Sequence, residues 1–109
     1  GGDRDAGKRP QFGMIAKCHC DKIYVTDDNP RTENPHTIRN AIMRTAPGAV
    51  EVADRAEAIA LAMQTMQPED ILLILGKGHE QGQDFGTHIV PFDDAQTVRK
   101  IAKRLWGVG

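Results

Sequence analysis

The most apolar run in the chain, Ile71-Leu72-Leu73-Ile74-Leu75, does most to limit the folds that this sequence can adopt. Five consecutive aliphatic residues lack the alternation of a strand that has one face in water. A continuous run is instead typical of a strand covered on both faces, as in a parallel sheet. We therefore expect residues 71–75 to form a central strand.

Strand and helix patterns alternate along the rest of the chain. The other strand candidates are 22–26, 49–52 and a short edge strand within 87–92. Helical spacing of apolar residues follows Pro10, Asn34, Asp54 and either Asp93 or Asp94. This alternation predicts βαβ units, and so a single α/β domain with a mostly parallel sheet and helices on both faces.

Two of the expected helices have recognisable starts. Asn34 is a favourable N-cap, and Pro35 suits the first helical position. Asp54 and Glu57 have the spacing of a capping box, with Asp in place of Ser or Thr. Apolar residues recur along this second helix and predict a face packed in the core: Ala56, Ile59, Ala60, Met63 and Met66.

The loop after the first strand candidate, TDDNPR at 26–31, concentrates polar chemistry. Arg31 offers a planar fork of donors for a carboxylate or phosphate, and Asp28 offers an acceptor for an ammonium group. Pro30 restricts the backbone and biases Asn29 towards an extended conformation. Both signs of charge suit an amino-acid-like ligand, although an ordinary strand-to-helix turn with a solvated Arg31 would also explain the loop.

Three loops are expected to meet at one edge of the sheet, because strand-to-helix loops of a parallel sheet share an edge. These are 1–10, 28–31 and 76–80. Their polar groups are Arg4, Asp28, Asn29, Arg31, Lys77, His79 and Glu80. The third loop is no phosphate loop of the Walker type, because Lys77 is followed by Gly78, His79 and Glu80, with no Ser or Thr for magnesium. A nucleotide site formed by this loop alone is therefore disfavoured.

Composition excludes several classes of protein. Fourteen basic and fifteen acidic residues give a net charge of -1, with no basic stripe of the kind that binds nucleic acid. No apolar stretch approaches the ~20 residues that cross a bilayer, so no membrane partner is expected. Cys18 and Cys20 flank His19, but their spacing favours free thiols of a cytoplasmic protein over a metal site.

Four motifs taken together are highly specific: GGDRDAGKRP at 1–10, TDDNPRTENP at 26–35, GKGHE at 76–80 and FDD at 92–94. In this order and spacing they resemble the C-terminal domain of the Mur ligases. The resemblance covers essentially the whole chain and is strongest to the UDP-N-acetylmuramoyl-tripeptide synthetases that add meso-2,6-diaminopimelate. It implies a Rossmann-like domain.

The resemblance also implies an activity. Ligases of this family use ATP and Mg²⁺ to join an amino acid to UDP-N-acetylmuramoyl-L-Ala-D-Glu in cytoplasmic peptidoglycan synthesis, which serves cell-wall growth, cell shape and cell division. An acyl phosphate forms first, and the acceptor amine then attacks it. The C-terminal domain closes over a central ATPase domain, which binds most of the ATP. We therefore expect residues 1–109 to be the C-terminal domain of a longer ligase, with the N-terminal and central ATPase domains absent and no catalytic residue, metal ligand or activity of its own.

Site residues follow from the same resemblance. Residues 28–31, which are Asp28, Asn29, Pro30 and Arg31, match the diaminopimelate-recognition motif, and further amino-acid contacts match Arg4, Gly76 and Glu80. Diaminopimelate differs from lysine by a second carboxylate, which Arg31 could bind through two hydrogen bonds, while Asp28 and Glu80 could hold the distal ammonium. A stand-alone regulatory domain that binds an amino acid would also explain residues 28–31.

Overall fold

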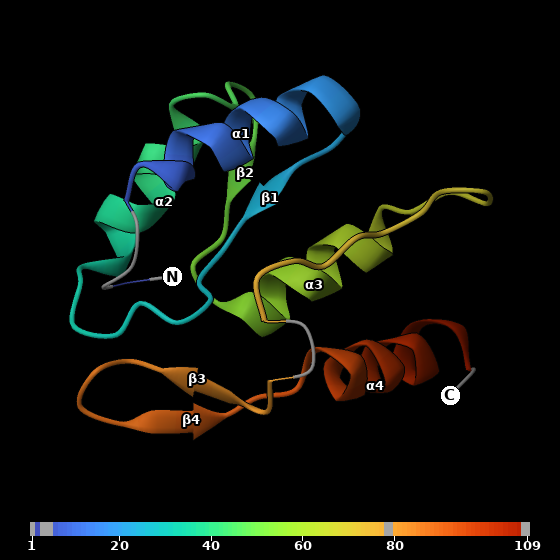
Figure 1. Cartoon of the computed structure of the whole chain (residues 1–109). Helices are drawn as coiled ribbons and strands as arrows, with labels where there is room; N and C mark the ends of the chain where they lie inside the picture. The colour runs from blue at the N-terminus through green and yellow to red at the C-terminus, as the bar shows by residue number, and fades with distance from the viewer. Residues whose placement is uncertain (1, 3–5, 78–79, 108–109) are drawn as a thin grey trace.

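The computed structural model describes residues 2, 6–77 and 80–107, and it confirms an α/β chain (Figure 1). Four helices and four short strands occur in this part of the chain. In order they are α1 (Lys8–His19), β1 (Tyr24–Val25), α2 (Pro35–Met43), β2 (Val50–Glu51), α3 (Arg55–Gln64), β3 (Gly82–Asp84), β4 (Ile89–Pro91) and α4 (Asp94–Trp106). None of these helices is long and apolar enough to cross a membrane.

The strands form two separate pairs. β1 and β2 are parallel, with Tyr24 opposite Val50 and Val25 opposite Glu51. β3 and β4 form an antiparallel hairpin, in which Gln83 is opposite Val90. α1 and α2 lie on one side of the parallel pair, and α3 lies on the other (Figure 1). The expected edge strand within 87–92 is thus confirmed as β4, whereas one parallel pair does not establish the larger, mostly parallel sheet.

The prediction of a central strand at residues 71–75 is wrong. These residues are assigned to no strand, and Ile71, Leu73 and Leu75 are 85%, 67% and 76% exposed. Leu72 and Ile74 point the other way and pack against the core of α3 and α4. The segment therefore has one covered face instead of two, because it lies against helices on one side and pairs with no strand in the part of the chain that the structure describes.

The core lies between α3 and α4. Ile59, Met63 and Ile101 form its buried centre. Partly buried apolar side chains surround this centre: Ala60, Met66, Leu72, Ile74, Phe92, Val98, Ala102 and Leu105. The predicted apolar stripe of α3 is confirmed for Ile59 and Met63, which belong to the buried centre, and for Ala60 and Met66, which pack beside them. Ala56 is partly buried but lies outside this cluster.

Nearby capping side chains fix the starts of α2 and α4, whereas a contact with a distant residue fixes the start of α3. The Asn34 side chain accepts a hydrogen bond from the His36 amide at 2.9 Å, as the N-cap prediction requires. Asp93 likewise accepts from the Gln96 amide at 3.1 Å, so Asp93 and not Asp94 caps α4. Asp54 occupies the N-cap position of α3, but its side chain makes no capping hydrogen bond, so the capping-box prediction is wrong. The buried side chain of the next residue, Arg55, holds this end of α3 instead.

Candidate functional site

The loop at 26–31 is held at the carboxyl end of β1 by backbone and side-chain hydrogen bonds. The Asp27 amide and the Thr26 hydroxyl both donate to the Ala53 carbonyl, at 3.3 and 3.0 Å. Asn29 is buried, and its side-chain oxygen accepts from the Asp84 amide at 2.9 Å. The two acidic residues of the loop are thereby presented from a fixed backbone.

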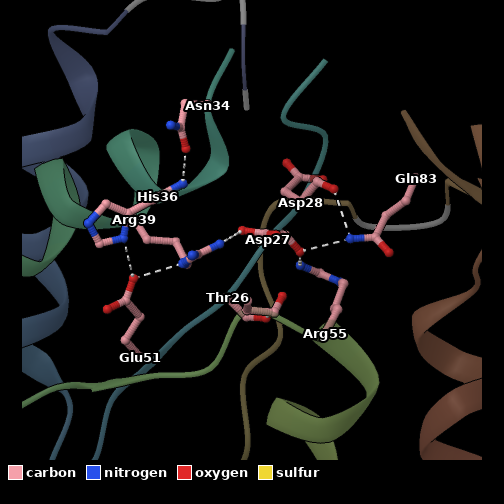
Figure 2. Close-up of polar contacts among 10 residues, drawn as sticks. Thr26, Asp27, Asp28, Asn34, His36, Arg39, Glu51, Arg55 and Gln83 are labelled. Atoms are coloured by element: carbon pink, nitrogen blue, oxygen red, sulfur yellow. Dashed lines mark hydrogen bonds and ion pairs between the residues drawn. The ribbon is translucent and has the colours of Figure 1, made fainter. Parts of the chain in front are cut away.

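The Asp27 carboxylate takes part in an ion-pair network within the domain. Its Oδ1 accepts from Nη1 of Arg39 at 2.6 Å, and Nε of Arg39 donates to Glu51 at 2.8 Å (Figure 2). The Arg39 hydrogen bond holds the pKa of Glu51 below its ordinary value. Burial lowers the pKa of Arg39, but its hydrogen bonds and charge interactions with Glu51 and Asp27 together raise it above the ordinary value. The Asp27 carboxylate is thus occupied by this ion-pair network, in which Asp28 takes no part.

Asp28 lies against the third loop, as the sequence predicts. A Cβ built on Gly76 would be 3.1 Å from Oδ2 of Asp28, and the φ of Gly76 is +106°, so glycine is needed there for both space and backbone conformation. The other oxygen of Asp28, Oδ1, is buried and has no hydrogen-bond partner among the described residues. A buried carboxylate oxygen without a donor is costly, and an ammonium group is a suitable partner for it.

The backbone and the guanidinium of Arg31 are both held by hydrogen bonds. Its φ is 56°, and its amide donates to the Asp84 carbonyl at 2.8 Å. Nη1 donates to the carbonyls of Gly2 and Asn29, at 2.9 and 3.4 Å. Nε lies 3.9 Å from the Asp84 carboxylate, and the side chain is 22% exposed. The guanidinium is therefore pre-positioned, and part of it remains open to solvent.

The other residues predicted for the site differ in burial. Pro30 is buried, and its carbonyl is in close contact with Gly2, which leaves no room for a side chain there. Glu80 is exposed, and its amide donates to the Lys77 carbonyl at 3.2 Å. Arg4 and His79 lie outside the described residues. The structure thus joins the second loop to Gly2 and to Gly76, and leaves Glu80 at the margin.

The comparisons with known proteins decide the family. A family model described as "Mur ligase, glutamate ligase domain" matches residues 1–78. The chain belongs to this Mur ligase family.

Several relatives carry one name, UDP-N-acetylmuramoyl-L-alanyl-D-glutamate--2,6-diaminopimelate ligase. The chain is 54% identical to the protein from Bradyrhizobium diazoefficiens over 90% of its own length and 20% of that protein. It is 53% identical to the protein from Brucella melitensis over 96% of its length and 22% of that protein. A solved structure of a ligase with this name is similar with a TM-score of 0.88 and 38% identity, over 95% of this chain and 22% of that one. The chain spans about a fifth of the length of these curated relatives.

The Mur ligase domain contains an anchor that reasoning from the sequence missed. Arg55 is 2% exposed, and its guanidinium makes two hydrogen bonds of 2.7 Å to the carboxylate of Asp94. Gln83, also buried, donates to the carbonyls of Asp27 and Asp28, at 3.1 and 3.0 Å. One signal was available: a cation in the first turn of a helix is opposed by the helix dipole, so Arg55 needed an acidic partner.

No cluster of three or more metal-ligating side chains occurs among the residues that the structure describes. Cys18 and Cys20 are free thiols, exposed at and just beyond the end of α1.

Proposed function

We propose that this Mur ligase domain binds the incoming amino acid, meso-2,6-diaminopimelate, in the cytoplasmic enzyme that joins it to UDP-N-acetylmuramoyl-L-Ala-D-Glu. In this proposal residues 1–109 are the Rossmann-like C-terminal domain, and a central ATPase domain of the same polypeptide is their partner. The curated relatives named for this reaction support the assignment, at 54% and 53% identity. The similarity to a solved ligase of that name supports the Rossmann-like fold.

The observation that carries the proposal is the buried oxygen of Asp28 beside Gly76, which has no hydrogen-bond partner among the described residues and lies in the same loop as the fixed guanidinium of Arg31. The distal end of diaminopimelate carries both an ammonium and a carboxylate. We assign the ammonium to Asp28, with Glu80 in support, and the carboxylate to Arg31. Four further contacts complete the proposed site: Arg4, Asn29, Pro30 and Gly76.

Discrimination against lysine follows from the same geometry. Lysine has the distal ammonium but lacks the second carboxylate, so bound lysine would cover Arg31 without satisfying it. A site that hydrogen-bonds a ligand group rejects the analogue without that group, because its own polar atoms are left unpaired. Asp28 thus provides affinity for both ligands, and Arg31 selects between them.

ATP and Mg²⁺ belong to the proposed reaction, but the described residues do not fit them. Lys77, the lysine in the glycine-rich loop, is 4% exposed, and its ammonium donates to the Gly82 carbonyl at 2.6 Å. A phosphate-binding lysine needs its ammonium free for the phosphate oxygens. We therefore assign neither ATP nor Mg²⁺ to a residue of this chain and derive no step through them.

An amide NMR titration with meso-diaminopimelate, and with L-lysine for comparison, tests the proposal. We expect the amides of Asp28, Asn29, Arg31, Gly76 and Glu80 to shift with diaminopimelate and to respond far less to lysine. Arg31→Lys keeps the charge but loses the fork, and it should weaken diaminopimelate binding about tenfold, which corresponds to about 1.4 kcal/mol. Asp54→Asn is the matched control, because Asp54 is exposed and makes no capping hydrogen bond.

Two results would count against the proposal. Equal shifts with both ligands would show that Arg31 does not read the second carboxylate. Diaminopimelate shifts confined to other parts of the chain would show that the loop at 28–31 is not the site.

A further inference from the structure

Arg55 is the first residue of α3 and is almost wholly buried. Its Nε and Nη2 each donate to a different carboxylate oxygen of Asp94, the first residue of α4, at 2.7 Å. Two parallel hydrogen bonds fix both the position and the plane of the guanidinium. Its remaining donors are therefore aimed in set directions.

Those donors reach the two loops of the proposed site. Nη1 donates to the Asp27 carbonyl and Nη2 to the Leu75 carbonyl, both at 3.1 Å. Asp27 immediately precedes Asp28, and Leu75 immediately precedes Gly76. A single planar group thus holds the backbone one residue before each of the two residues that meet in the site.

The Asp27 carbonyl is fixed from a second direction. Nε2 of Gln83, on β3, donates to the same oxygen at 3.1 Å and to the Asp28 carbonyl at 3.0 Å (Figure 2). A carbonyl oxygen has two lone pairs, and Arg55 and Gln83 use both at Asp27. No comparable second donor reaches the Leu75 carbonyl among the described residues, so Arg55 is its sole side-chain tether there.

We propose that Arg55 is a positioning residue, which sets the spacing between Asp28 and Gly76 and through it the affinity and selectivity for the amino acid. The inference rests on the proposed function. A buried ion pair by itself adds little net stability compared with apolar residues of similar volume, whereas a rigid fork of five donors specifies geometry. Arg55 supplies four directed hydrogen bonds to three segments that are far apart in the sequence.

A first experiment needs no ligand. A Cβ built on Gly76 would lie 3.6 Å from Cβ of Asp28, so the α-protons of Gly76 and the β-protons of Asp28 are close enough for a nuclear Overhauser effect. Arg55→Lys keeps the charge but cannot bind Asp94 and both carbonyls together, so this effect should disappear. Met63→Ala, on the same helix and in the α3–α4 core, lowers stability without touching either carbonyl and should leave it intact.

A second experiment measures binding by the same NMR titration. Arg55→Lys should weaken meso-diaminopimelate binding about tenfold or more, because small displacements of binding groups have large effects, and should narrow the preference over lysine. Met63→Ala, measured at a temperature where it is folded, should keep the wild-type preference. If Arg55→Lys does not fold, Asp94→Asn provides the test, because it loosens the guanidinium and should weaken both the Overhauser effect and binding.

The outcomes separate the two proposals. Failure of the wild-type chain to respond to diaminopimelate would reject the proposed function, while the Overhauser effect would still report whether Arg55 sets the loop spacing. An unchanged Overhauser effect and unchanged selectivity in the folded Arg55 or Asp94 variant would overturn the positioning role. Equal losses in Met63→Ala would also overturn it, since they would show that general destabilisation is sufficient.

Discussion

Two extended segments lead into the two halves of the proposed site, and they are held in opposite ways. β1 has two residues, pairs with β2, and buries Val25 to 5% exposure. Residues 71–75 are longer and more apolar, yet Leu73 is 67% exposed and the segment pairs with no described strand. Hydrophobic side chains favour burial, but what they bury against is decided by neighbouring elements and not by their own composition.

The attachments of the two segments differ accordingly. β1 is fixed by backbone pairing with β2 and with the residue that follows it, since the Val52 amide donates to the Val25 carbonyl at 2.9 Å. Residues 71–75 are attached by the apolar contacts of Leu72 and Ile74 and, at their end, by the bond from Arg55 to Leu75. The Gly76 half of the site thus depends on fewer contacts than the Asp28 half.

The largest expected effect tests burial directly. Val25→Ala removes two methyl groups from a buried strand and should lower the free energy of unfolding by about 2 kcal/mol. Leu73→Ala removes more carbon but from an exposed side chain, and should change it by less than about 0.5 kcal/mol. Urea unfolding followed by circular dichroism measures both.

Ile74→Ala tests the covered face of the same segment, since Ile74 belongs to residues 71–75 but packs against the core. Its cost should fall between those of the other two variants. A loss at Leu73 as large as that at Val25 would show that residues 71–75 are covered on both faces in solution, and would restore the central-strand prediction.

What the sequence could predict depended on distance along the chain. The Asn34 cap was predictable because the side chain bonds to an amide two residues away. The meeting of Asp28 with Gly76 was predicted from the rule that loops after parallel strands share an edge. The two loops do meet, but residues 71–75 pair with no described strand, so the rule does not explain why.

The failures are long-range pairings. Arg55 and Asp94 are 39 residues apart, and Gln83 and Asp27 are 56 apart, with no periodic signal that would connect either pair. The Asp54 cap failed for a related reason, because the start of α3 is fixed by the buried guanidinium that follows it. Residues 71–75 carried the pattern of a buried strand, but the pattern does not specify whether a second strand is there to pair with it.

Two glycine-to-alanine substitutions, compared with each other, test the contact that follows residues 71–75. Gly76→Ala places a Cβ 3.1 Å from Asp28 in a backbone with φ +106°, and should cost about 1–2 kcal/mol in total, mostly for the left-handed conformation and the remainder for the contact. Gly48→Ala has a similar φ of +91° but meets no atom within 4 Å, so it carries the conformational cost alone. The difference between the two free energies of unfolding therefore isolates the contact with Asp28, and a zero difference would mean that the loop moves away freely.

The smallest expected effect lies on the β1–β2 side and depends on pH. The Arg39 hydrogen bond lowers the pKa of Glu51 from its ordinary value of 4.5, so the folded state favours the charged carboxylate. Its stabilisation is present above 4.5 and is lost as the pH falls through the lower pKa of the folded state. Because the Glu51 side chain is 34% exposed, solvent screens the pair and the effect should be smaller than that of either glycine variant.

Comparison of the unfolding midpoints of the wild-type protein and Glu51→Gln, from neutral pH down to about pH 3, measures this contribution. Arg39 and His36 both face Glu51, and Asp27 shares Arg39, so the difference between the two proteins reports the contribution of the Glu51 carboxylate and its partners. The wild-type advantage should be constant above the ordinary pKa and shrink below it. An advantage that grows on acidification would contradict the stabilising ion pair between Arg39 and Glu51.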